Sequence, residues 1–250
     1  MSEQVIVTYR GAVCEIRLNR PEKRNALTLD MYRALTEAIE TAEALDEVRV
    51  VLLSGEGACF TAGNDLKDFL AGPPIEDPAH PTGRFVRAVA AMGKVLIAAV
   101  HGPTVGLGVT LLLHCDLVVA AERSTRLIAP FVQLGLVPEA GSTLLLPALM
   151  GHQRAAQLLL LGEPLDAPAA RACGLVNRVV DDEGLMEEAR ALAEAVACRP
   201  REALLATKRL LRHGRAPDVA GRMEEELREF AARLKSAEFA AAAQAFFSRR

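Results

Sequence analysis

The chain has 250 residues, of which 51% are hydrophobic and 24% charged, so it is long enough and apolar enough to bury a substantial globular core. Its net charge of −3, with no Trp and only two Tyr, argues against a basic nucleic-acid surface and against aromatic stacking platforms for single strands. Polar residues interrupt the apolar runs before they reach the ~20 residues of a membrane span, so no membrane association is expected.

Cysteine and histidine spacing excludes further classes. The five cysteines are widely separated and form no C-x-x-C pair, which predicts reduced, buried thiols in a cytoplasmic protein. The five histidines show no ligand spacing, so no metal site is expected. The first residues lack a basic segment followed by an apolar run, so no secretory signal is expected either.

Periodicity predicts strands alternating with helices up to about residue 180. The expected strands are residues 5–10, 12–18, 48–53, 95–100, 117–121 and 175–180. The expected helices are residues 28–45, 85–92, 109–114, 141–150, 152–161 and 167–172. Residues 71–82 are rich in Pro and Gly and are predicted to form a loop. This alternation is typical of an α/β fold.

The segment after Gly184 is rich in Ala, Leu, Glu and Arg and is predicted to be helical. Pro200 and Pro217 are expected to divide it into about three helices. Two interpretations of this tail stay open, since it either caps its own core or packs on a neighbouring subunit. We expect two regions, an α/β core over residues 1–197 and a helical region over residues 198–250.

One carboxylate stands out in the segment Gly-Leu-Val-Pro-Glu-Ala-Gly-Ser at residues 135–142. Glu139 follows a proline at the head of an apolar segment, where the unpaired N–H groups of a helix start stabilise an anion. Apolar surroundings would raise the pKa of this carboxyl toward that of a working base. The alternative is a solvated Pro-Glu turn.

Two glycine-containing loops, residues 62–66 and 105–109, each turn from a predicted strand into a helix. Each can present a backbone N–H at a helix start, and two such groups aimed at one point form an oxyanion hole. The alternative for each is an ordinary strand–helix connection. The Gly106-x-Gly108 pair lacks the third glycine of a dinucleotide-binding loop, because position 111 is Leu. Ser142 does not stand in a G-x-S-x-G nucleophile motif.

Taken together, four ordered motifs resemble the enoyl-CoA hydratase/isomerase (crotonase) superfamily. They are Ile-Arg-Leu-Asn-Arg-Pro-Glu-Lys-Arg-Asn-Ala-Leu (16–27), Phe-Thr-Ala-Gly-Asn-Asp-Leu (60–66), His-Gly-Pro-Thr-Val-Gly-Leu-Gly (101–108) and Gly-Leu-Val-Pro-Glu-Ala-Gly (135–141). The resemblance implies a spiral of ββα units followed by an all-helical trimerisation region. It further implies a homotrimer or a dimer of trimers that binds an acyl-CoA thioester. Coenzyme A is then part of the substrate, and no separate cofactor is expected.

The resemblance also implies roles for particular residues. The backbone N–H groups of Asn64 and Leu107 are expected to hold the thioester oxygen, and Glu139 is expected to be the acid/base. The residues expected to contact coenzyme A or the substrate are Lys23, Arg24, Ala26, Ala62, Gly63, Asp65, Leu66, Lys67, Gly106 and Phe131. For Lys23 and Arg24, a solvated turn is the open alternative.

The two glutamates of family hydratases correspond to Thr110 and Phe131 in this chain, and neither is a carboxylate. This departure argues against classical hydration, whereas Glu139 matches the single acid/base of the Δ3,Δ2-enoyl-CoA isomerase branch. We therefore expect an isomerase of fatty-acid β-oxidation that shifts a double bond from position 3 to position 2 through a dienolate. The alternatives are an enoyl-CoA hydratase (a lyase), a ring-epoxide acyl-CoA isomerase, and a catalytically silent protein that binds acyl-CoA or RNA.

Overall fold

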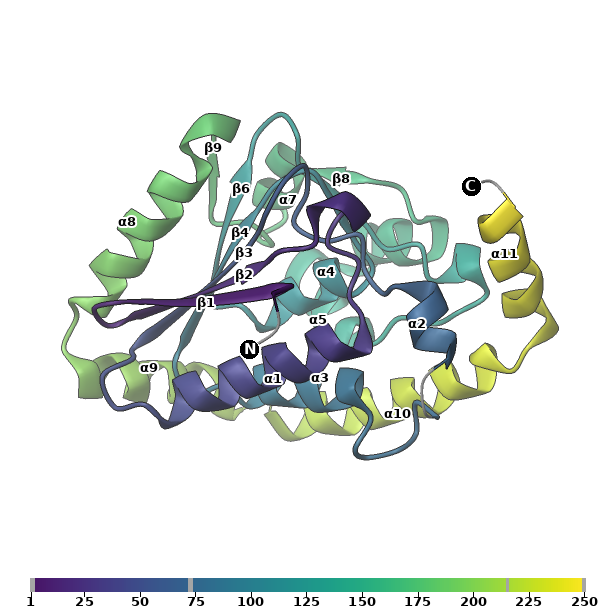
Figure 1. Ribbon diagram of the computed structural model, residues 1–250, viewed down its shortest axis with the longest axis horizontal. Helices are drawn as coiled ribbons and strands as arrows, with labels where there is room; N and C mark the ends of the chain where they lie inside the picture. Colours follow the sequence, from purple (N-terminus) through teal and green to yellow (C-terminus); the bar gives the residue numbers. More distant parts are fainter. Residues whose placement is uncertain (1–2, 72–73, 215, 249–250) are drawn as a thin grey trace.

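The larger of two β-sheets forms the centre of the molecule (Figure 1). The computed structural model describes residues 3–71, 74–214 and 216–248. The large sheet has the order β1-β2-β3-β4-β6-β9; its first pair is antiparallel and the others are parallel. Its strands are β1 (Val5–Arg10), β2 (Val13–Leu18), β3 (Val50–Gly55), β4 (Val95–Val100), β6 (Leu117–Ala121) and β9 (Arg178–Val180). The predicted α/β alternation is confirmed, although β9 begins three residues later than expected.

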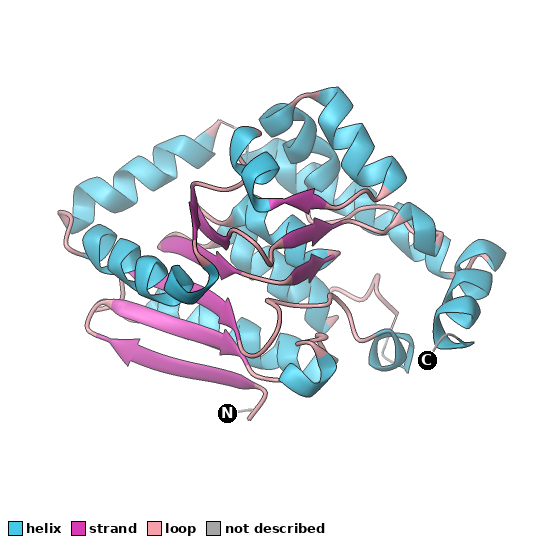
Figure 2. Ribbon diagram, turned by 90° about the horizontal axis from the view of Figure 1, so that it is seen from above, coloured by secondary structure: helices cyan, strands magenta, loops and turns pink. Residues whose placement is uncertain are grey.

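Helices cover the strands on both sides (Figure 2), because both sheet faces are apolar. Side chains alternate along β3, so Val51 and Leu53 face the larger core under α1 (Leu29–Ala44) and α3 (Pro81–Ala91). Val50 and Leu52 face a smaller core under α8 (Leu185–Ala197). Parallel strands buried on both faces are typical of an α/β fold.

A second, three-stranded sheet was not predicted. It joins β5 (Pro103–Val105) in parallel to β7 (Arg126–Ile128), and β7 antiparallel to β8 (Leu165–Asp166). These strands are two or three residues long, which is too short for a two-residue period to be recognised. They matter for function because β5 leads directly into the glycine-containing loop at Gly106.

The shorter helices of the core follow the predicted positions with local differences. They are α2 (Leu66–Ala71), α4 (Leu107–Thr110), α5 (Ser142–Met150), α6 (His152–Ala156) and α7 (Ala167–Ala172). The expected helix 152–161 ends as a π-helical turn over Gln157–Leu161. Helix α3 begins four residues earlier than predicted, because the His80 side chain accepts from Thr82 N and Pro81 occupies the first turn. Part of the predicted loop 71–82, residues 72–73, lies outside the described residues.

The helical tail has four helices within its described residues, not about three: α8, α9 (Arg201–His213), α10 (Ala216–Leu234) and α11 (Ala237–Ser248). Pro217 lies in the first turn of α10, where a proline is tolerated, and therefore does not end a helix. The additional break before α11 occurs at Ser236, whose hydroxyl accepts a hydrogen bond from Phe239 N. Helix α10 packs on its own chain, where Glu226 accepts a hydrogen bond from Thr143 N at the start of α5, whereas packing of the tail on a neighbouring subunit stays a prediction. Within the described part of the chain, no helix has the length and apolar character needed to cross a bilayer.

Candidate active site

A cavity of about 440 Å³ lies between α3, α10 and the loops that follow the strands. Its wall is mostly apolar, with side chains such as Val86, Val219 and Phe230. Asn64, Leu107 and Glu139, which lie far apart in sequence, all line this one cavity. The structure therefore brings together the three residues that the sequence singled out from three separate motifs.

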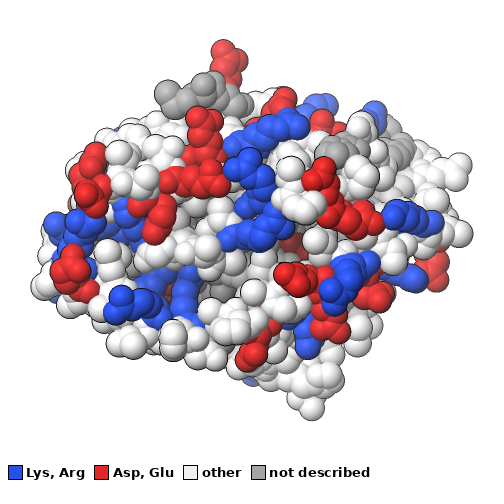
Figure 3. All heavy atoms as spheres, turned by 90° about the horizontal axis from the view of Figure 1, so that it is seen from below, with Lys and Arg blue, Asp and Glu red and all other residues white. Residues whose placement is uncertain are grey.

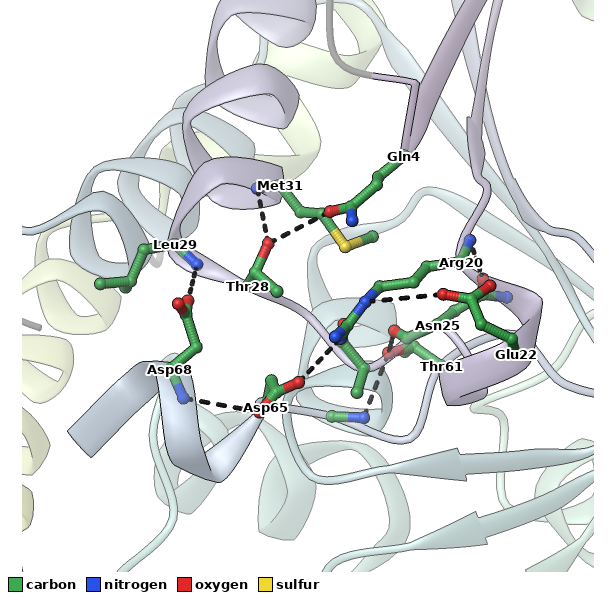
Figure 4. Close-up of polar contacts among 12 residues, drawn as sticks. Gln4, Arg20, Glu22, Asn25, Thr28, Leu29, Met31, Thr61, Asp65 and Asp68 are labelled. Carbon is green, nitrogen blue, oxygen red and sulfur yellow. Dashed lines mark hydrogen bonds and ion pairs between the residues drawn. The ribbon is translucent and has the colours of Figure 1, made fainter. Parts of the chain in front are cut away.

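The segment at Asn64 is held by an isolated parallel bridge to Leu27. Leu27 N donates to Gly63 O at 2.8 Å, and Asp65 N donates to Leu27 O at 2.9 Å. Residue 64 lies between these two bonds, so its own N–H points away from Leu27, and within the described residues this N–H has no acceptor. Arg20 Nη1 binds Asp65 Oδ2 at 2.8 Å, and Asp68 Oδ2 accepts from Leu29 N (Figure 4). These contacts fix the turn before α2.

The second N–H comes from Leu107, the first residue of α4. Gly106 N donates to Ile128 O at 2.8 Å, while the N–H of Leu107 has no acceptor among the residues that the structure describes. The two loops contact each other, since Val105 N donates to Thr61 O at 2.9 Å. A Cβ at Gly63, which has φ +82°, would lie 2.8 Å from Val105 O, so this close approach requires glycine.

Glu139 supplies the carboxylate of the cavity and is half-buried there. Burial raises the pKa of Glu139 to about 8, while a hydrogen bond from Thr110 Oγ1 at 2.5 Å opposes that rise. The charge of Glu226 contributes to the raised pKa. A carboxyl with a pKa near neutrality is suited to exchanging a proton with carbon. Thr110, which the resemblance placed at the position of a hydratase glutamate, donates this hydrogen bond to the carboxylate predicted to be the acid/base.

Three residues near the site were missed in the sequence. The Tyr32 hydroxyl is completely buried and donates to Asn64 Oδ1, and burial, together with the charge of Glu139, raises the pKa of Tyr32. His114 Nε2 donates to Ala140 O at 2.7 Å, and Glu226 Oε2 accepts from Gly141 N at 2.6 Å. A signal existed for Glu226, because it interrupts the apolar face of α10 at helical spacing from Val219, Met223 and Phe230.

Most residues predicted to contact coenzyme A lie in the segments 23–26 and 62–67, whereas Gly106 lies in the second glycine-containing loop, directly before α4. Ala62 N donates to Arg24 O at 2.9 Å, which brings the segment 23–26 against the segment 62–67. Lys23, Arg24 and Lys67 are exposed there, Ala26, Ala62, Asp65 and Leu66 are partly exposed, and Gly63 is buried. This stretch adjoins the cavity through Asn64.

Phe131 does not lie in the stretch formed by segments 23–26 and 62–67. It is buried in the larger core and is not among the described residues that line the cavity, so its predicted contact with substrate stays a prediction. The described residues hold no group of three or more His, Cys, Asp or Glu arranged to bind a metal. On the side that carries α1, α3 and α10, acidic and basic side chains are interspersed (Figure 3).

Comparison with known proteins identifies the class. The "Enoyl-CoA hydratase/isomerase" family model matches residues 8–250. A crystal structure of an enoyl-CoA hydratase/isomerase from Pseudoalteromonas atlantica superposes with a TM-score of 0.94 at 40% identity, covering 99% of this chain and 98% of that one. The chain therefore has the crotonase fold and belongs to the enoyl-CoA hydratase/isomerase family, whose members bind acyl-CoA substrates.

Named relatives lie in different branches of the family. The 1,2-epoxyphenylacetyl-CoA isomerase of Escherichia coli K12 is 39% identical over 206 residues, which cover 80% of this chain and 78% of that protein. Enoyl-CoA delta isomerase 2 of Rattus norvegicus is 34% identical over 254 residues, which cover all of this chain and 64% of the rat protein. Relatives named as hydratases match at similar identity. Similarity alone therefore does not separate the reactions of this family.

Proposed function

We propose that the protein is an acyl-CoA double-bond isomerase that converts a 3-enoyl-CoA into the conjugated 2-enoyl-CoA. The observation that carries this proposal is a single half-buried carboxylate, Glu139, in one apolar cavity with the two backbone N–H groups that have no acceptor in the described structure. Double-bond migration needs one group that removes a proton and returns it. It needs no second carboxylate to activate water.

In the proposed mechanism, the thioester oxygen accepts hydrogen bonds from the N–H groups of Asn64 and Leu107. Glu139 removes a proton from C2, and the electron pair delocalises over the thioester and the 3,4-double bond as a dienolate. The protonated Glu139 then gives the proton to C4, which moves the double bond into conjugation. Each N–H contributes ~3 kcal/mol to the stability of the transition state. The apolar cavity keeps water from the dienolate.

The surroundings of Glu139 favour isomerisation over hydration. The residue that touches it is Thr110, which donates to the carboxylate but cannot act as a second base. The cavity has another carboxylate in its wall, Glu224, but this side chain is exposed on α10. In this exposed position Glu224 faces solvent, unlike the half-buried Glu139.

The test is a paired assay of the purified protein. One arm follows the conversion of trans-3-hexenoyl-CoA to the 2-enoyl product, and the other follows the loss of the conjugated double bond of crotonyl-CoA. We expect turnover in the first arm and little in the second. Hydration in the second arm without isomerisation in the first would overturn the proposal.

We expect Glu139→Gln to lower kcat by at least about 1,000-fold, since it removes the only group assigned to proton transfer. Affinity for a saturated acyl-CoA, measured by calorimetry, should change little because the amide retains the size of the carboxylate. The exposed Glu37 on α1 provides the matched control, and Glu37→Gln should behave as wild type. Unchanged turnover in Glu139→Gln would exclude the mechanism.

A ring-epoxide acyl-CoA isomerase is the second candidate, favoured by the 39% identity to the Escherichia coli enzyme of that name. An oxyanion hole with one acid/base would serve that reaction as well, because it also moves protons next to a thioester. Adding 1,2-epoxyphenylacetyl-CoA as a third arm of the assay separates the two candidates.

A further inference from the structure

We infer that Glu226, on the C-terminal helix α10, is a positioning residue that holds the Glu139 loop in its reactive geometry. This inference rests on the proposed role of Glu139 as the base. Glu226 does not belong to any of the four motifs, and it follows Glu139 by more than 80 residues in the sequence.

The contacts of Glu226 lie directly on the catalytic loop. Its Oε2 accepts from Gly141 N at 2.6 Å, and its Oε1 accepts from Thr143 N at 2.9 Å and from Thr143 Oγ1 at 2.6 Å. These are the unpaired groups at the start of α5, so a side chain from a distant helix caps the helix that follows Glu139. Glu226 is only 4% exposed, and both of its carboxylate oxygens accept hydrogen bonds from this loop.

The loop needs an external restraint because its backbone is unusual. Ala140 has φ +60° and Gly141 has φ +73°, and the left-handed region is unfavourable for a non-glycine residue such as Ala140. Two side chains hold this conformation, since Glu226 accepts from Gly141 N and His114 Nε2 donates to Ala140 O. Glu139 immediately precedes this doubly anchored dipeptide.

Helix α10 also forms part of the cavity wall. Val219, Met223, Leu227 and Phe230 line the cavity, and Glu226 lies among them in sequence. One rigid helix therefore contacts both the space for the acyl chain and the loop of the base. A shift of α10 would move Glu139 relative to the substrate, and a displacement of about 1 Å at a reacting group can cost about 100-fold in rate.

Glu226 also acts on Glu139 through its charge. The groups that face the pair are Tyr32 of α1, Thr110 beside Glu139, His114, and Arg222 and Thr143 beside Glu226. Burial raises the pKa of Glu226, while its hydrogen bonds from Thr143 and Gly141 oppose that rise; the negative charge of ionised Glu226 in turn raises the pKa of Glu139. A role in positioning and charge therefore predicts a change in the pH profile that loss of packing alone would not produce.

The experiment compares Glu226→Gln and Glu226→Asp with the control Glu229→Gln, an exposed glutamate on the same helix. In Glu226→Gln one oxygen becomes an NH₂ group that faces an N–H donor, and the charge is lost. We expect kcat to fall about 100-fold with little change in KM. The ascending limb of kcat/KM, which reports ionisation of Glu139, should move to lower pH. Glu226→Asp keeps the charge and should leave the limb in place with a smaller loss of kcat.

Two outcomes would overturn the inference: wild-type kcat in Glu226→Gln, or a reduced kcat with an unmoved limb, which would indicate a structural role alone. If Glu226→Gln does not fold, Thr143→Val removes one of the three donors and retains the backbone bond. It should lower kcat several-fold at unchanged KM, and a wild-type kcat in that variant would equally exclude the positioning role.

The assay uses whichever reaction of the paired assay the wild type catalyses, so failure of the isomerase proposal does not decide the role of Glu226. An infrared titration supplies a readout without turnover. The carboxyl band that disappears in Glu139→Gln reports the pKa of Glu139, and this pKa should be lower in Glu226→Gln than in the wild type. An equal pKa in both proteins would overturn the inference.

Discussion

The hydroxyl of Thr110 stabilises the charged form of Glu139, which makes this contact the simplest way to adjust the pKa of the proposed base. Replacing Thr110 by Val removes the 2.5 Å hydrogen bond and keeps the volume of the side chain. Because the bond lowers the pKa of Glu139 against the effect of burial, its loss should move the ascending limb of kcat/KM from about 8 to higher pH. At pH 7 the rate should therefore fall about tenfold.

The measurement is a pH–rate profile of wild type, Thr110→Val and Thr110→Ser. The serine variant retains a hydroxyl at the same position and should restore the position of the limb. If the ascending limb of kcat/KM in Thr110→Val lies at the same pH as in the wild type, or at a lower pH, the assigned contact is contradicted.

At the scale of elements, the turn that presents Asn64 depends on the partly buried ion pair between Arg20 and Asp65. Arg20 also donates to Ala26 O at 3.0 Å, so it joins the loop before α1 to the turn before α2 (Figure 4). Arg20→Leu should lower the free energy of unfolding by about 2 kcal/mol, because the carboxylate of Asp65 loses its charged partner. It should also lower kcat about tenfold through the displaced N–H of Asn64.

Arg33→Leu is the control for this variant, since Arg33 pairs with Asp30 in an exposed ion pair of α1 that contributes less than about 1 kcal/mol. Urea denaturation and steady-state kinetics of both variants check the prediction. Equal effects of the two substitutions would show that the Arg20–Asp65 pair does not position the turn.

Elements with a long apolar period were predictable, whereas those that depend on distant contacts were not. Helix α1 and strand β4 followed from the spacing of their apolar residues. Strand β5 was missed, because three residues bonded only to distant segments, β7 and Thr61, carry no local pattern. In the same way, the motifs gave Asn64, Leu107 and Glu139, but Tyr32 and Glu226 are polar groups whose partners lie 32 and 85 residues away.

The oligomeric state and the boundary between residues 1–197 and 198–250 concern the whole molecule, and both stay predictions. The contacts of α10 with the Glu139 loop are made within one chain. Each chain therefore carries the complete set of residues assigned to proton transfer, whether it functions alone, as a trimer or as a dimer of trimers.

The raised pKa of Glu139 also affects the stability of the whole molecule. The folded protein retains a proton up to about pH 8 on a group that releases it near pH 4.5 when unfolded. Stability from this group is therefore complete below pH 4.5 and is lost as pH rises through 8. Glu139→Gln removes this loss, so at pH 9 the variant should be more stable than wild type by about 2–4 kcal/mol, with little difference at pH 4.

Thermal or urea unfolding at both pH values checks this prediction, with Glu37→Gln as the control. Parallel stability curves for wild type and Glu139→Gln would show that the carboxyl is not strained by burial. The expected gain in the inactive variant is the stability that the active site gives up for function.

The bond between Glu226 and Gly141 closes a loop of 85 residues, and this separation governs when the site can form during biosynthesis. A ribosome that adds about 5–20 residues per second needs about 4–17 s to proceed from Gly141 to Glu226. Once residue 180 has been added, all strands of the large sheet have been synthesised, while the loop of Glu139 still lacks its cap. A nascent chain can therefore contain a nearly complete sheet while the Glu139 loop is still unrestrained, and formation of the proposed site depends on the later synthesis of α10.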